Sequence, residues 1–178
     1  MSQRNFYSLS GTPWLRPRNA RAPGLVPPTC PSRVPVVSSP VAREALTVLV
    51  YSHRPEVREA ITNAVGRRPA PDLGRITFLE ADGIADVLTA ADAGTVDLAI
   101  LDGEAQPTGG MGVSRQLKNE IDDCPPIIVT VRRRDDRWLA TWSQADAVLV
   151  HPLDPITAAE VVADVLRRFR ADVPVVRS

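Results

Sequence analysis

From residue 46 onward, apolar residues follow two alternating patterns. Short apolar runs rich in β-branched residues predict strands buried on both faces, and they cover residues 46–51, 75–79, 96–101, 126–131 and 147–150. Between these runs, apolar residues recur at helical spacing. After Pro55, which suits a first helical turn, they stand at Val57, Ile61, Ala64 and Val65. The later helical segments span residues 84–91, 113–121, 135–144 and 159–169.

Five strand–helix units in succession predict an α/β fold, in which a doubly wound, five-stranded parallel sheet carries helices on both faces. In such sheets the ligand crevice lies at the carboxyl ends of the strands. The side chains that follow the predicted strands are therefore the candidate site residues. They are Ser52, His53, Asp102, Thr130 and His151.

Residues 1–45 have a different composition. They hold eight of the 17 prolines and six arginines against one acidic residue, so this segment carries a net charge of +5 and the rest of the chain −5. No helical or strand pattern survives between the prolines, and we predict an extended, polyproline-like tail. Residues 46–172 are the predicted folded domain, and residues 173–178 are a short C-terminal extension.

Two interpretations of the tail remain open. It is either a disordered extension, added in the plainest case by an early choice of start codon, or a segment that orders on a partner protein. The second is favoured by Phe6, Tyr7 and Trp14, because solvated tails are usually poor in large apolar side chains. Our sharper hypothesis is that these three fill pockets on a partner, while the prolines reduce the entropy lost on docking.

The composition argues against several classes of function. With 21 basic and 21 acidic residues, the chain has no net charge to attract nucleic acid or anionic lipid. Its two cysteines, Cys30 and Cys124, form no metal or redox motif and are expected to be free thiols. No apolar run has the length of a membrane span or of a secretory signal. We therefore expect a cytoplasmic protein without a metal or cofactor.

The strand ends resemble those of the receiver domains of response regulators (CheY-like), over about residues 46–170. The marks are Asp97-Leu-Ala-Ile-Leu-Asp102 followed by Pro107 and Gly110, then Pro125-Pro-Ile-Ile-Val-Thr130, and His151-Pro152. The resemblance implies a flavodoxin-like sheet with the strand order 2-1-3-4-5. It also implies that Asp102 stands in the position of the family's phosphoacceptor, and Thr130 in that of its switch hydroxyl.

Other positions of the family pattern differ. The two acidic residues that hold Mg²⁺ in the family are Ser52 and His53 here, and the family's lysine is His151. A hydroxyl and an imidazole are poor Mg²⁺ ligands, and a neutral imidazole does not replace a fixed ammonium. Aliphatic residues also replace the family's aromatic switch. We therefore expect Asp102 to remain unphosphorylated, because the charge of a phosphoryl group would be unpaired there.

Asp102 and the two histidines have further interpretations. Asp102 can simply cap the loop after its strand, and His53 and His151 can converge on it as a metal pair. Of these alternatives, we favour a protonated imidazole paired with Asp102 over a metal pair. Such an ion pair would mimic that of an inactive receiver. The glycines of residues 109–112 are attributed to a tight strand-to-helix loop rather than to a phosphate cradle.

The segment Arg132–Trp142 is the candidate partner surface, because the resemblance implies that the fourth helix, fifth strand and fifth helix bind partners. Trp138 and Trp142 are four residues apart and so lie on one side of a helix. Either both cover the core, or at least one is exposed and forms an interface anchor beside Arg132, Arg133 and Arg134. Nucleic-acid binding by these arginines is the weaker alternative.

The predicted function is that of a non-catalytic, degenerate receiver domain acting as a protein-binding module or accessory subunit. The chain is similar to orphan single-domain receivers of actinobacteria such as mycobacteria, some encoded beside the genes for the proton-pumping NADH:quinone oxidoreductase. This resemblance implies that respiratory complex as partner, and a location peripheral to the cytoplasmic membrane. The alternative is a phosphorylatable regulator that uses Asp102 and receives its phosphoryl group from a histidine kinase. We expect no enzymatic activity, and, because the sequence ends at Ser178, we also expect no output domain.

Overall fold

Five parallel strands form one sheet in the part of the chain that the structure describes. The computed structural model describes residues 45–172. The predictions for the tail, including Phe6, Tyr7 and Trp14, and for the extension over residues 173–178 lie outside the described residues. The domain boundaries drawn from the sequence therefore stay predictions.

The order of the strands places the candidate residues at one edge of the sheet. The strands are β1 (Leu46–Tyr51), β2 (Ile76–Ala81), β3 (Leu98–Asp102), β4 (Ile127–Val131) and β5 (Ala147–Val150). They pair in parallel in the order β2-β1-β3-β4-β5. This confirms the predicted flavodoxin-like topology. The carboxyl ends of β1, β3 and β4 are neighbours, with Asp102 directly opposite Thr130 in the register.

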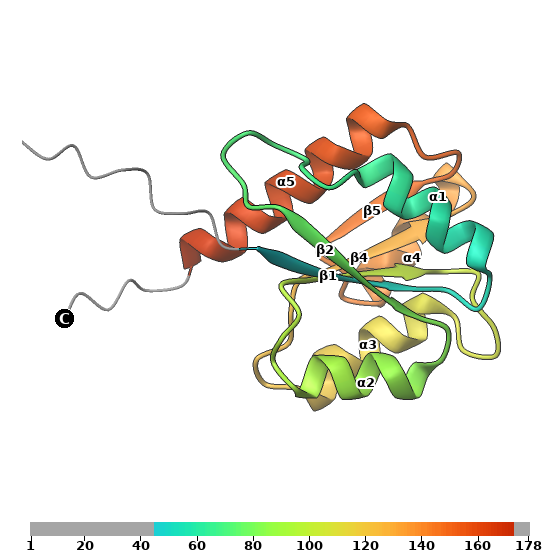
Figure 1. The fold of residues 1–178 in the computed structure, drawn as a ribbon. Coiled ribbons are helices and arrows are strands. Elements are labelled where there is room, and N and C mark those ends of the chain that lie inside the picture. The colour runs from blue at the N-terminus through green and yellow to red at the C-terminus, as the bar shows by residue number, and fades with distance from the viewer. Residues whose placement is uncertain (1–44, 173–178) are drawn as a thin grey trace, which may run out of the picture. The chain divides into compact units, whose positions relative to one another are not determined.

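Helices cover both faces of the sheet, as predicted. They are α1 (Pro55–Val65), α2 (Ile84–Asp92), α3 (Gly110–Glu120), α4 (Arg137–Trp142) and α5 (Pro155–Asp172), and a 3₁₀ turn η1 (Arg134–Asp136) precedes α4. Figure 1 shows α1 and α5 on one face and α2 and α3 on the other. No helix among residues 45–172 combines the length and the apolar character that a membrane span requires.

The two faces of the sheet each bury a separate apolar layer. Side chains such as Ile100 and Ile128 pack with Ile61 of α1 and Val162 of α5. Their neighbours Leu101 and Val129 face α2 and α3 instead. All residues of β3 and β4 are buried, because these strands lie inside the sheet and alternate between two covered faces. The central strands are therefore a rigid base for the side chains at their ends.

Some helices and strands begin or end at other residues than the sequence pattern predicts. Helix α5 begins at Pro155 rather than near Ala159, because Asp154 Oδ2 accepts a hydrogen bond of 2.8 Å from the backbone N–H of Thr157. Strand β3 extends to Asp102, one residue beyond the predicted apolar run. The fourth helical segment is shorter than expected and begins as the turn η1.

Gly110 allows α3 to begin directly beside the end of β3. A Cβ at this position would lie 2.6 Å from the carbonyl oxygen of Asp102, a distance that a real side chain does not tolerate. Gly103 has the same constraint, since its Cβ would lie 2.5 Å from the carbonyl oxygen of Thr130. These close approaches support the attribution of the glycines to a tight strand-to-helix connection.

Candidate functional site

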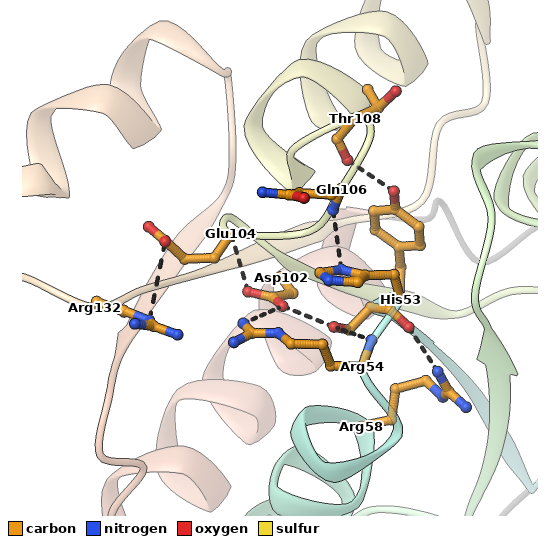
Figure 2. A network of polar contacts seen from close by, with 10 residues as sticks. His53, Arg54, Arg58, Asp102, Glu104, Gln106, Thr108 and Arg132 are labelled. Carbon is orange, nitrogen blue, oxygen red and sulfur yellow. Dashed lines mark hydrogen bonds and ion pairs between the residues drawn. The ribbon is translucent and has the colours of Figure 1, made fainter.

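Asp102 is the central residue of the candidate site. It ends β3 and is 1% exposed, so water screens its carboxylate poorly. Its Oδ2 atom accepts hydrogen bonds from Ser52 Oγ at 2.7 Å and from Arg54 Nη2 at 3.1 Å. Its Oδ1 atom accepts a third bond, of 3.0 Å, from the backbone N–H of Glu104. Figure 2 shows Arg54 and the loop at Glu104 in contact with Asp102.

The cation that pairs with Asp102 is Arg54, a residue that the sequence analysis did not identify. Arg54 directly precedes α1, and its backbone N–H donates a 3.1 Å hydrogen bond to Ser52 Oγ. Its side chain is 26% exposed, so it forms a partly buried ion pair with the carboxylate. The signal in the sequence that could have indicated this role is the position of Arg54, directly before Pro55, where a helix begins beside the crevice.

The expectation that a protonated imidazole pairs with Asp102 is wrong. His53 is exposed, and its Nδ1 atom accepts a 3.0 Å hydrogen bond from the backbone N–H of Gln106, on the other side of Asp102 from Arg54 (Figure 2). His151 faces the pocket without an ion pair to the carboxylate. Burial lowers the pKa of His151 below its usual value, and Arg54 supplies the charge that was assigned to an imidazole.

Two polar atoms in this region are buried and have no hydrogen-bond partner among the described residues. One is Oγ1 of Thr130, whose residue is fully buried and lies opposite Asp102 in the register. The other is Nε of Arg54. Each is a donor whose burial without a partner costs about 1–3 kcal/mol. Both atoms lie in the packed interior next to Asp102 and are not accessible to solvent.

Hydrogen bonds from β1 and α1 hold the loops around the pocket. The Tyr51 hydroxyl donates a 2.7 Å bond to the carbonyl of Thr108, in the loop between β3 and α3. Burial, together with the nearby Asp102 charge, raises the pKa of Tyr51. Arg58 donates a 2.7 Å bond to the carbonyl of Ser52, which fixes the segment from which Arg54 reaches Asp102.

Comparison with known proteins shows the family to which the chain belongs. The chain is 48% identical over 128 residues to an uncharacterised response regulatory protein of Mycobacterium tuberculosis, found in two strains; the match covers 72% of this chain and 96% of that protein. The chain belongs to the response regulator receiver family. No family model matches it.

Solved receiver structures share the fold at low sequence identity. The receiver domain of AraT from Geobacillus stearothermophilus is 22% identical, with a TM-score of 0.56 over 72% of this chain and 98% of that chain. A CheY-like receiver protein of Methanospirillum hungatei is 11% identical, with a TM-score of 0.57 over 72% of this chain and 99% of that chain. These likenesses concern the fold, and the residues of this receiver's pocket have to be judged from their own geometry.

The residues present in this receiver do not fit the Mg²⁺ ion that the family pattern implies. The Ser52 hydroxyl donates a hydrogen bond to Asp102, and the Nδ1 atom of His53 accepts one from the backbone N–H of Gln106. Among residues 45–172, no group of three His, Cys, Asp or Glu side chains is placed to hold a metal ion. Mg²⁺ prefers several hard oxygen ligands, and the guanidinium of Arg54 repels a cation at the remaining carboxylate.

A cavity of about 390 Å³ opens beside Asp102. Its lining consists of Arg54, Val57, Asp102, Arg132, His151 and Pro152. Arg132 lies 3.9 Å from Glu104 Oε2, a long contact between two largely exposed side chains. Three of the five predicted pocket residues, Ser52, Asp102 and Thr130, therefore meet at the buried base of the site. His151 lines its opening, whereas His53 does not line the cavity and accepts a hydrogen bond from the backbone of Gln106.

The two tryptophans of the receiver's fourth helix are exposed. Trp138 is 67% and Trp142 51% exposed, so α4 does not use them to cover the core. The Arg115 guanidinium lies 4.6 Å from the centre of the Trp142 ring, and Arg115 Nη1 donates a 3.1 Å hydrogen bond to the Trp142 carbonyl. The three consecutive arginines before α4 are exposed as well: Arg132, Arg133 and Arg134.

Proposed function

We propose that this receiver is a protein-binding module whose Asp102 does not take part in phosphoryl transfer. The proposal depends above all on one observation, the ion pair between Arg54 and the buried carboxylate of Asp102. In this proposal the chain is neither a phosphoacceptor nor an enzyme. The protein would transmit information through contacts with other proteins.

The contacts of Asp102 explain why it would be a poor acceptor. Phosphoryl transfer requires a free carboxylate oxygen and cations that neutralise the charge of the transferred group. Here Oδ2 is engaged by Ser52 and Arg54, and Oδ1 by the backbone of Glu104. An incoming phosphoryl group would have to displace Arg54 from Asp102, at a site poorly suited to Mg²⁺.

Incubation of the full chain with acetyl phosphate and Mg²⁺ tests this proposal. Intact-protein mass spectrometry should detect no phosphorylated species. An Asp102→Asn variant provides the matched control, because it removes the acceptor while keeping the shape of the side chain. Stoichiometric labelling that disappears in this variant would overturn the proposal. Beryllofluoride bound to the wild-type pocket would overturn it as well.

The exposed surface of α4 supports the protein-binding role. Trp138 and Trp142 are large apolar side chains in contact with solvent, and tryptophan and arginine are the residue types that most often anchor interfaces. We expect Trp138→Ala and Trp142→Ala to reduce recovery of the partner from a pull-down. Leu79→Ala is the matched control, because Leu79 is 40% exposed on the edge strand β2, away from α4. Equal losses in all three variants would contradict a role for this surface.

The finer proposal is that the chain is an accessory or regulatory subunit of a larger assembly. The Pro- and Arg-rich tail would order on that partner through Phe6, Tyr7 and Trp14. The resemblance to orphan actinobacterial receivers suggests the respiratory NADH:quinone oxidoreductase, with the receiver in the cytoplasm and peripheral to the membrane. Affinity purification with the full chain and with residues 2–40 deleted tests both statements. A partner recovered equally by both forms would contradict the role of the tail.

A second candidate function is phosphorylation at Asp102 by a histidine kinase. The specific observation in its favour is the hydroxyl of Thr130, which is buried beside Asp102 and has no partner among the described residues. Such a hydroxyl is suited to bind a phosphoryl oxygen. Recovery of a histidine kinase in the same purification, together with labelling of Asp102, would favour this function.

A further inference from the structure

The side of α4 that carries both tryptophans borders α3 and is separate from the groove between α4 and α5. The Arg115 guanidinium of α3 lies 4.6 Å from the centre of the Trp142 ring. Trp138 precedes Trp142 by one helical turn and lies on the same side of α4. The groove among α4, β5 and α5 is lined by Arg134 and Arg137 but by neither tryptophan. Arg115, Trp138 and Trp142 therefore define a different surface, the α3–α4 surface.

Contacts from α3 hold the α3–α4 surface in place. Arg115 Nη1 donates a 3.1 Å hydrogen bond to the Trp142 carbonyl, and the buried Ser114 hydroxyl donates a 2.9 Å bond to the Ser143 carbonyl. Both carbonyls lie at the C-terminal end of α4, where intrahelical partners are missing. Trp142 is thus exposed and yet supported by a stacked guanidinium. An anchor that is already ordered loses little conformational entropy on binding.

The arginines around the tryptophans make this region basic, although the folded part of the chain is acidic. Residues 132–142 contain four arginines and two aspartates, a net charge of +2, and Arg115 raises it to +3. Glu104, whose Oε2 lies 3.9 Å from Arg132, offsets one of these charges. Residues 46–178 as a whole carry −5. A negatively charged ligand is therefore attracted here and repelled by most of the remaining domain.

The charge argues against several occupants of the surface. Residues 1–45 carry +5, so the tail does not complement the arginines. A symmetric dimer through this surface would place the arginines of one copy against those of the other. Nucleic acid has the matching sign, but Asp135 and Asp136 interrupt the arginines, and the exposed tryptophans present apolar area that phosphates do not cover. The occupant that remains is a protein with both acidic and apolar side chains.

We propose that the α3–α4 surface binds an acidic segment of another protein that carries an apolar side chain among its carboxylates. The apolar side chain packs on the Trp138 and Trp142 rings, and the carboxylates pair with the surrounding arginines. Tryptophan and arginine are the residue types that most often anchor interfaces. The inference rests on the proposed function in that the chain binds proteins. It adds the chemistry of the partner and the side of α4 on which the partner binds.

Selection of a random-peptide display library on the immobilised full chain tests the chemistry of the partner. We expect the enriched peptides to be acidic and to contain Leu, Phe or Trp. The most enriched peptide, made synthetically, is then titrated into the ¹⁵N-labelled full chain. The indole N–H signals of Trp138 and Trp142 should shift saturably, while that of Trp14 should not. Because carboxylates and guanidinium groups attract each other, the affinity should fall as the salt concentration rises.

Substitutions on the surface measure its contribution to binding. Trp138→Ala and Trp142→Ala should each weaken binding of the synthetic peptide by about tenfold or more, as for interface anchors. Both side chains are exposed, so the variants should fold, and circular dichroism checks this. Arg115→Gln should weaken binding roughly fivefold, because it removes one charge and the support of the Trp142 ring. Arg75→Gln is the matched control, since Arg75 is exposed and directly precedes β2, at the opposite edge of the sheet from β5.

Four outcomes would overturn the inference: no enrichment, enriched peptides that are basic or uncharged, indole signals that do not shift, or equal effects of the Arg115 and Arg75 variants. Tighter binding of single-stranded DNA than of the peptide, with the same indole shifts, would assign the surface to nucleic acid and overturn the inference as well. A protein partner bound through another face would refute this inference alone. Labelling of Asp102 by acetyl phosphate and Mg²⁺ would refute the proposed function instead, because Arg115, Trp138 and Trp142 do not line the cavity beside Asp102.

Discussion

Replacing Arg54 with Met removes the guanidinium that lies 3.1 Å from Asp102 Oδ2 and leaves an apolar side chain of similar length. Loss of one partner from a buried ion pair costs about 3–5 kcal/mol, whereas an exposed pair contributes about 0–1 kcal/mol. Asp102 is 1% exposed and Arg54 26%, and Asp102 keeps its bonds from Ser52 and Glu104. We therefore expect the variant to lose about 2 kcal/mol in the free energy of unfolding.

Urea denaturation followed by far-ultraviolet circular dichroism measures this loss. A double-mutant cycle with Asp102→Asn isolates the pair itself, and we expect a coupling energy of about 1–2 kcal/mol. Arg133→Met is the control for removing an exposed arginine, with an expected effect below about 0.5 kcal/mol. The reasoning is refuted if the Arg54 and Arg133 variants are equally stable, or if the Arg54 and Asp102 substitutions are simply additive.

Three further predictions concern the same carboxyl ends of the strands. Gly110→Ala should cost more than about 2 kcal/mol, because its Cβ would lie 2.6 Å from the Asp102 carbonyl oxygen. Gly112→Ala, whose Cβ has its nearest neighbour at 3.8 Å, should be neutral or stabilise by up to about 1 kcal/mol; urea denaturation of both variants compares them. Thr130→Val removes a buried hydroxyl without a partner among the described residues, so the urea midpoint should stay constant or rise, and a clear fall would contradict this assignment. Burial lowers the pKa of His151 in the folded chain below 6.5, its usual value. As the pH falls, the imidazole of the unfolded chain is therefore protonated before that of the folded chain. Stability measured in phosphate-free buffer should therefore decline from about pH 7 to about pH 5.5, and His151→Gln should flatten that decline; an unchanged slope would contradict it.

The sequence predicted the features of the fold that depend on periodicity. Runs such as residues 126–131 have no polar face, and this pattern is characteristic of inner strands of a parallel sheet. The order of the strands then brings the ends of β1, β3 and β4 together, so Ser52, Asp102 and Thr130 could be identified as neighbours.

Arg54 could not be identified by the same rule, because it does not follow a strand directly. Its long side chain reaches Asp102 from the entry to α1, and the strand pattern does not determine in which direction such a side chain turns. The exposure of the tryptophans was also left open. Helix α4 spans six residues, and its pattern did not determine which side would face the sheet; in the structure Trp138 and Trp142 are both exposed.

The charged and polar groups of the pocket depend on one another. A buried Asp102 with no acidic neighbours to hold a metal ion needs a permanent cation, and an arginine supplies one because its guanidinium stays protonated at all physiological pH values. Placing acidic residues at positions 52 and 53 alone should therefore not create an effective Mg²⁺ site, since Arg54 would pair with the added carboxylates.

Two variants separate these effects. Ser52→Asp with His53→Asp adds the carboxylates, and the same pair combined with Arg54→Met also removes the competing cation. Isothermal titration calorimetry with Mg²⁺ should detect clearly tighter binding in the triple variant, because its carboxylates are no longer neutralised by the guanidinium. If the double variant binds Mg²⁺ as tightly as the triple variant, the guanidinium does not control the charge of the pocket, and the absence of acidic residues at positions 52 and 53 would by itself account for the poor fit to Mg²⁺.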